Sequence, residues 1–161
     1  MKKQTRRQFI LTTAGAAATA PFISTSVTRA RARQSRKLGF ALCGLGGLSA
    51  RQIAPALQQT EYCRLAGVIT GSADKAREWQ EHYGIPDERV YTYDTMHRLA
   101  DAPDIHVVYI LTPNVLHLPH TLAAVQAGKH VFCEKPMEVS VERCQQMIDA
   151  CRNAGLRLGI A

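Results

Sequence analysis

The chain has 161 residues, five cysteines and a formal net charge of +7 at pH 7. Nine of its 20 basic residues lie within residues 1–37, which hold no acid, so residues 38–161 carry 11 bases against all 13 acids. The segment that can form a globular domain is therefore close to neutral, which excludes the strongly basic surface expected of a nucleic-acid-binding domain.

The first 32 residues have the layout of an export signal. Arg6 and Arg7 lie in a basic stretch, an apolar stretch rich in Ala and Thr follows, and Ala30–Ala32 forms a small-x-small cleavage site. This order predicts a twin-arginine signal peptide over 1–32, a linker over 33–37 and a folded domain over 38–161. The twin-arginine export machinery is the implied partner, and the implied location is periplasmic or otherwise exported. An uncleaved signal would act as a membrane anchor, although its apolar stretch is shorter than the roughly 20 residues of a stable span.

The apolar run Leu38–Cys43 has the length of a strand, and a glycine-rich turn and a helical pattern follow it. In such a unit Gly44 permits the tight turn, Gly46 lets the backbone approach a pyrophosphate, and the helix start directs free N–H groups at that anion. Ser49 stands at the third position of the G-x-G-x-x-G pattern, a departure that keeps the residue small. The turn is predicted to bind a dinucleotide.

The rest of the chain alternates strand and helix patterns. Further strands are expected at Leu65–Thr70, Val90–Tyr93, Ile105–Leu111, His130–Cys133 and Leu156–Ile160, with helices capped by Ser72, Asp94 and Ser140 and one containing Pro119 in its first turn. Alternating strands and helices predict a doubly wound α/β fold with a parallel sheet, in which ligands bind at the carboxyl ends of the strands. The glycine turn, Thr70, Pro113 with Asn114, and Glu134 to Pro136 all follow such ends, so we expect them along one edge.

The end of the second strand indicates which dinucleotide binds. NAD-specific folds of this type usually place Asp or Glu there, to accept hydrogen bonds from the ribose hydroxyls. Here Thr70 and Ser72 offer hydroxyls, and Lys75 follows within a turn to supply positive charge for a 2′-phosphate. Asp74 is the main objection, and it is explained by the preference for an acid in the first turn of a helix. These residues predict NADP rather than NAD.

Four motifs occur together in the domain: Gly44-Leu45-Gly46, Leu111-Thr112-Pro113-Asn114 with His117, Ala127-Gly128-Lys129-His130-Val131, and Cys133-Glu134-Lys135-Pro136-Met137. Over roughly residues 37–161 they resemble the Gfo/Idh/MocA family of sugar and polyol oxidoreductases, and most of all its exported glucose-fructose oxidoreductase branch. The resemblance implies that Lys135 lies near the nicotinamide and the reacting carbon as the catalytic residue, and that Thr70 and Lys75 hold the NADP phosphate. It also implies a carboxy-terminal substrate domain that this chain lacks.

From the patterns and the resemblance together, the residues expected to bind the cofactor are Gly44, Leu45, Gly46, Gly47, Leu48, Thr70, Ser72, Lys75, Thr112, Pro113, Asn114, His117, Glu134 and Lys135. No metal site is expected, because no carboxylate or cysteine lies close to His117 and His120 to complete one. The cysteines are expected in the core, since Cys144 and Cys151 stand roughly 10 Å apart on one helix, beyond disulfide reach.

These expectations describe an NADP-dependent oxidoreductase of a sugar or polyol, represented by its cofactor domain. The alternative is a nucleotide-binding fragment without catalytic turnover. A methyltransferase also uses a Gly-x-Gly turn on a similar sheet, but it gives no reason for Glu134-Lys135-Pro136. An uncovered last strand predicts self-association, because an unpaired apolar edge is a template for another chain.

Overall fold

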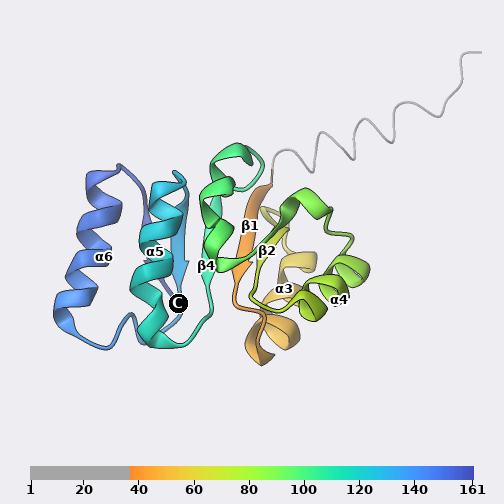
Figure 1. Cartoon of the computed structure of the whole chain (residues 1–161), viewed down its shortest axis with the longest axis horizontal. Coiled ribbons are helices and arrows are strands. Elements are labelled where there is room, and N and C mark those ends of the chain that lie inside the picture. The colour runs from red at the N-terminus through yellow and green to blue at the C-terminus, as the bar shows by residue number, and fades with distance from the viewer. Residues whose placement is uncertain (1–36) are drawn as a thin grey trace, which may run out of the picture. The chain divides into compact units, whose positions relative to one another are not determined.

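The computed structural model describes residues 37–161, so the predicted signal peptide lies outside the described residues. They form a six-stranded, fully parallel sheet in the order β3-β2-β1-β4-β5-β6, which confirms the doubly wound fold (Figure 1). The strands are β1 (Leu38–Cys43), β2 (Cys63–Ile69), β3 (Val90–Tyr91), β4 (Val107–Ile110), β5 (His130–Cys133) and β6 (Leu158–Ile160). The helices are η1 (Ser49–Ile53), α3 (Ala54–Gln59), α4 (Ala73–Tyr83), η2 (Asp87–Arg89), η3 (Tyr93–Asp101), η4 (Asn114–Leu116), α5 (His117–Gln126) and α6 (Val141–Asn153).

Two apolar cores lie on opposite faces of the sheet, because successive strand residues point to opposite sides. Ala41 and Cys43 of β1 face the core shared with η3, α5 and α6, whereas Leu42 faces the core shared with α3 and α4. Burial of each large side chain such as Leu42 contributes about 1.5 to 3 kcal/mol to folding. In Figure 1, α5 and α6 lie side by side over one half of the sheet and α3 and α4 lie over the other half.

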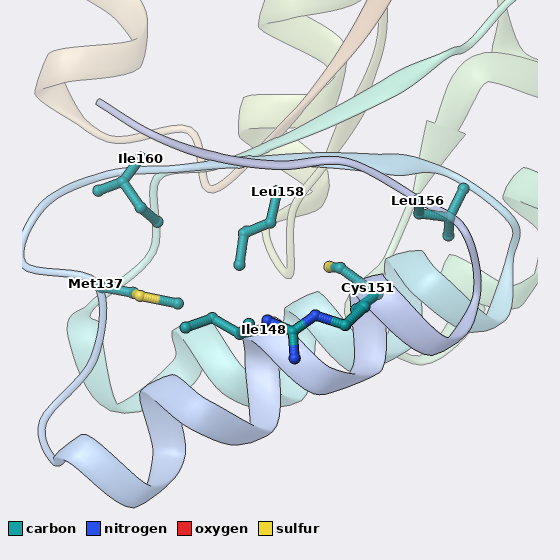
Figure 2. Close-up of a pocket in the computed structure, with 7 residues that line it drawn as sticks. Met137, Ile148, Cys151, Leu156, Leu158 and Ile160 are labelled. Carbon is teal, nitrogen blue, oxygen red and sulfur yellow. The ribbon is translucent and has the colours of Figure 1, made fainter.

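The sheet face that carries α3 and α4 is left open beyond β1. A groove of about 630 Å³ runs there, lined by Phe40, Leu57, Tyr109, Phe132 and Leu158 among others. A second pocket, of about 390 Å³, lies between α6 and the end of the described chain, where Figure 2 shows the side chains of Met137, Ile148 and Ile160 around it. Both hollows are mainly apolar.

Most helix boundaries follow the predicted caps. The Oγ atoms of Ser72 and Ser140 each accept a hydrogen bond, at 3.3 Å, from the backbone N–H three residues later. Gly84 ends α4 with φ +65°, in the left-handed region that glycine tolerates best.

Two local predictions were wrong. The third strand is only two residues long, and the helix after it is a 3₁₀ helix capped by Thr92 rather than Asp94, because Thr92 and Thr95 bond to each other's backbone N–H groups. The helix after the glycine turn begins with a π-helical turn at Ser49–Ile53. Helix and strand propensities alone do not reveal the short strand, the 3₁₀ helix or the π-helical turn.

The described residues contain no helix that is both long enough and apolar enough to cross a membrane. The five cysteines all lie within residues 37–161 and all are unpaired. Cys43, Cys133 and Cys151 are buried, and burial raises the pKa of each of these thiols, which is consistent with their role as small core side chains.

Candidate cofactor and active site

The turn after β1 requires glycine at its first position. Gly44 has φ +99°, and its N–H donates to Ile69 O at 2.9 Å. A Cβ on Gly44 would lie 2.9 Å from Thr112 Cγ2 and 3.1 Å from the Leu111 carbonyl. The Ser49 hydroxyl, at the departing third position of the motif, donates to Gly44 O at 2.5 Å and closes the turn from the helix side. The glycine therefore lets the chain turn directly against the loop that follows β4.

The next residue of the turn, Gly46, faces open space. Gly46, Gly47 and Leu48 are exposed, and a Cβ built on Gly46 would meet no atom within 4 Å. Leu45 points the other way and is buried in the core beneath α3 and α4. The loop thus offers bare backbone at the surface, which is what close approach of a pyrophosphate needs.

The end of β2 is joined to the glycine loop by a lysine. Lys75 Nζ donates to Leu45 O at 3.1 Å, while Thr70 Oγ1 accepts from Ser72 N at 3.2 Å. Asp74, the acid that counted against NADP, forms an ion pair with Arg77 one turn further along α4. The predicted phosphate residues Thr70, Ser72 and Lys75 therefore lie close together, and the carboxylate of the neighbouring Asp74 forms an exposed ion pair within its own helix.

The loop after β4 is held from within by two histidines. His117 is fully buried, with Nε2 2.8 Å from Thr112 O and Nδ1 3.1 Å from Met137 O, so both ring nitrogens face carbonyl oxygens. His120 Nδ1 lies 3.0 Å from Thr112 Oγ1, and its ring stacks on Tyr93. Burial, together with the nearby His117, lowers the pKa of His120, so it is neutral at pH 7. In this structure His117 positions the loop, and Pro113 and Asn114 are its exposed residues.

The loop after β5 carries Glu134 and Lys135. Tyr109 OH donates to Glu134 Oε1 at 2.7 Å, and the second carboxylate oxygen accepts from Lys135 N at 3.3 Å. Burial and the bond to Glu134 raise the pKa of Tyr109, which keeps it a donor. The peptide bond between Lys135 and Pro136 is cis. Within residues 37–161 the exposed Lys135 ammonium has no hydrogen-bond or ion-pair partner, which leaves it available to a ligand.

A residue that no sequence pattern singles out, Glu138, joins these two loops. The buried Glu138 accepts from Leu118 N at the start of α5, from Val139 N, and from Arg143 Nη2 at 2.6 Å. Arg143 also donates to Val115 O at 2.8 Å. The bond from Arg143 and the two backbone bonds hold the pKa of Glu138 at about 2. A glutamate near a helix start carries no signal that it will be buried, so only the packing of α5 against α6 reveals it.

The pairing register of the parallel strands places the four loops at one edge of the sheet. Cys43 pairs with Ile69 on one side and with Ile110 on the other, and Ile110 pairs with Cys133. The strands therefore end level, and the glycine loop, Thr70, Thr112 and Glu134 follow directly. The structure brings the four predicted loops together in this way, with the side chains of Leu45 and His117 buried beneath them. Contacts between these loops and a cofactor stay predictions. No group of three or more metal-ligating side chains occurs in the described part of the chain.

Residues 38–161 match the oxidoreductase family GFO_IDH_MocA, described as an NAD-binding Rossmann fold. The chain belongs to this family. It is 32% identical over 122 residues to D-xylose 1-dehydrogenase [NADP(+)] of Haloarcula marismortui, covering 76% of this chain and 34% of that protein. It is 33% identical over 124 residues to inositol 2-dehydrogenase of Klebsiella pneumoniae, covering 77% and 35%.

Solved structures show the same relationship. Aldose-aldose oxidoreductase from Caulobacter crescentus superposes with a TM-score of 0.77 at 47% identity, over 78% of this chain and 38% of that one. A 3-ketoreductase from Actinomadura kijaniata, solved with NADP, gives a TM-score of 0.68 at 26% identity, over 77% and 38%. The chain thus spans about a third of the length of the curated relatives it matches.

Proposed function

We propose that this chain is the cofactor-binding part of an NADP-dependent oxidoreductase that acts on a sugar or polyol. The observation that carries the proposal is the edge shared by an open glycine loop and an unpaired Lys135 ammonium. The printed names of the relatives, which include a xylose dehydrogenase, an inositol dehydrogenase and an aldose oxidoreductase, support the substrate class.

Lys135 is the catalytic residue of this proposal. When bound, the nicotinamide supplies hydride transfer to or from a carbon that bears a hydroxyl group. An ammonium beside the oxygen of that carbon stabilises developing negative charge and can exchange a proton with it. Glu134, held by Tyr109, fixes the backbone of Lys135 through its second oxygen, so the ammonium extends from a rigid support.

The choice of NADP rests on the end of β2. Thr70 and Ser72 supply hydroxyls, Lys75 is fixed within reach of both the glycine loop and the helix start, and the nearby Asp74 is paired with Arg77. No carboxylate stands at Thr70 itself to repel a 2′-phosphate. Charge-assisted hydrogen bonds from such groups are stronger than neutral ones.

Titration of NADP⁺ and NAD⁺ into the purified chain tests the proposal. We expect tighter binding of NADP⁺, and we expect Thr70→Asp to erase or reverse the preference through about 1 to 3 kcal/mol of lost bonding and added repulsion. Thr60→Asp, far from this edge on the loop before β2, is the matched control and should keep the preference. Equal affinities would contradict the choice of NADP, and failure to bind either nucleotide would contradict the whole assignment.

A nucleotide-binding role without turnover is the second candidate. This role is favoured by the surroundings of Lys135, because no described side chain forms a hydrogen bond or ion pair with its ammonium through which a proton could be relayed. Incubating the 161-residue chain with NADP⁺ and an aldose distinguishes the two roles. Steady formation of NADPH supports the enzyme, whereas binding without reduction supports the second role for this length of chain.

Export through the twin-arginine pathway is also a proposal, and it rests on the sequence of residues 1–32. Replacing Arg6 and Arg7 by lysine tests it, since this keeps the charge and removes the arginine pair. We expect the substituted chain to stay in the cytoplasm while the parent is recovered from the periplasm. Equal distribution of the two would contradict the proposal.

A further inference from the structure

Arg51 is the one charged residue between Leu38 and Thr60, and it follows Gly47 by four positions. Helical residues four apart share a face, and helical side chains lean toward the amino-terminal end of the helix. The Arg51 side chain does so: its Nη2 and Cζ lie 2.8 and 3.4 Å from the point that a Cβ on Gly47 would occupy. Its guanidinium therefore covers the glycine loop where a side chain would otherwise stand.

The charge of Arg51 is not neutralised by the part of the chain that the structure describes. The side chain is exposed, with no ion pair or hydrogen bond to residues 37–161. Lys75 brings a second cation to the same loop, through its bond to Leu45 O, and the adjacent Asp74 is paired with Arg77. Two cations from different elements thus flank one short loop, without a carboxylate bound to either.

The two cations lie at different parts of the loop. Arg51 lies over Gly47, next to the bare backbone of Gly46, where a dinucleotide fold receives the pyrophosphate. Lys75 lies at Leu45, beside the end of β2, where such a fold receives the adenosine ribose and, in NADP, its 2′-phosphate. The pyrophosphate is common to NAD and NADP, whereas the 2′-phosphate distinguishes them.

We propose that Arg51 binds the pyrophosphate of the cofactor and so raises the affinity for NADP and NAD alike, whereas Lys75, in the role at the 2′-phosphate proposed above, raises the affinity for NADP alone. This inference rests on the proposed function and adds a residue that the glycine motif does not include. An arginine suits the task because its planar guanidinium can make paired hydrogen bonds to phosphate oxygens.

Isothermal titration of the purified chain with NADP⁺ and NAD⁺ tests whether Arg51 and Lys75 have these separate roles. We expect Arg51→Gln to weaken both nucleotides by the same factor, about tenfold for the loss of one charge-assisted contact. Lys75→Gln should weaken NADP⁺ by about tenfold and leave NAD⁺ unchanged. Arg51→Lys, which keeps the charge, should recover part of the lost nucleotide affinity. Added salt screens the charge of Arg51, so it should reduce the difference in affinity between the parent and Arg51→Gln. Arg152→Gln, an exposed change on α6, is the matched control and should alter neither affinity.

Unchanged affinities in Arg51→Gln would overturn the inference and leave the proposed function standing. A loss of affinity for NADP⁺ alone in Arg51→Gln would also overturn the inference, because Arg51 would then bind the 2′-phosphate rather than the pyrophosphate. A parent chain that binds neither nucleotide would overturn the proposed function and this inference together. Thermal unfolding of each variant checks that a lost affinity is not a lost fold. The Arg51 side chain is exposed and makes no bond to the described residues, so the unfolding midpoint of Arg51→Gln should match the parent, whereas Lys75→Gln loses the bond to Leu45 O and should unfold at a slightly lower temperature.

Discussion

Gly44 and Gly46 stand two residues apart and are glycine for different reasons. Gly44 turns the chain with φ +99° and touches the loop after β4, so a side chain there meets both backbone strain and a clash. Gly46 has free space around it, so a side chain there leaves the protein undisturbed but occupies room that a ligand needs. Conformation explains one glycine, and ligand approach explains the other.

We therefore expect Gly44→Ala to lower the free energy of unfolding by about 1 to 3 kcal/mol. Gly46→Ala should change it little and should weaken NADP⁺ binding instead. Chemical denaturation and nucleotide titration of both variants provide the check. A stable Gly44→Ala protein, or full nucleotide affinity in Gly46→Ala, would contradict the corresponding half of this prediction.

Tyr109 and Glu134 are the second pair at the residue scale, because one oxygen of Glu134 is bound to Tyr109 and the other to the backbone of Lys135. We expect Tyr109→Phe and Glu134→Gln each to cost about 1 kcal/mol of stability. The double variant should cost less than the sum, since Tyr109→Phe removes the hydrogen bond that Glu134→Gln weakens by taking the charge from its acceptor. A double-mutant cycle by denaturant unfolding measures this coupling, and strict additivity would show that the bond is not made in solution.

At the scale of elements, the loops after β4 and β5 are fastened to each other and to two helices. His117 joins Thr112 to Met137, and Glu138 joins the start of α5 to Arg143 of α6. These bonds fix the positions of Pro113, Asn114 and Lys135 without using them. The exposed site residues are therefore supported by a buried polar layer beneath them.

Stability in acid should depend on Glu138. The pKa of this carboxyl is lowered from 4.5 to about 2, so its contribution is fully present above pH 4.5 and disappears as the pH falls toward 2. We expect Glu138→Gln to lower the free energy of unfolding at pH 7. Because glutamine does not titrate, the free energy of unfolding of this variant should fall less between pH 4.5 and about 2 than that of the parent. Denaturant unfolding at several pH values provides the measurement.

Asp149→Asn is the matched control for this prediction, because Asp149 forms an exposed ion pair with Arg152 on the same helix. Exposed pairs contribute little, so this variant should keep the acid dependence of the parent. If Glu138→Gln lost stability with pH as steeply as the parent does, another carboxylate would have to be responsible.

At the scale of the whole molecule, the groove of about 630 Å³ over β4, β5 and β6 leaves a mainly apolar surface uncovered in the part of the chain that the structure describes. Such surface is costly to leave in water and favours association. We expect the purified chain to self-associate, as measured by light scattering over a range of concentrations.

Leu57→Glu places a charge in this groove and should shift the chain toward monomer. Leu122→Glu makes the same change at an exposed position of α5, on the other face of the sheet, and should leave the association unchanged. A parent chain that stays monomeric at all concentrations would contradict the prediction.

The amino-acid sequence by itself determined the parallel sheet, the caps at Ser72 and Ser140, and the gathering of four loops at one edge. These follow from local rules: hydrophobic period, turn chemistry, and the level ends of parallel strands. The family motifs fall in these same loops, so the glycine loop that is expected to bind the cofactor could be predicted from the sequence.

Only the tertiary structure decided which side chains hold those loops. Lys75 reaches Leu45 across 30 residues of sequence, Tyr109 reaches Glu134 across 25, and His117 reaches Met137 across 20. The covering of Gly47 by Arg51 is local, but it depends on a rotamer that the sequence does not specify. Long-range partners are chosen by the packing of strands and helices, and a carboxylate such as Glu138 becomes buried only when that packing surrounds it with donors.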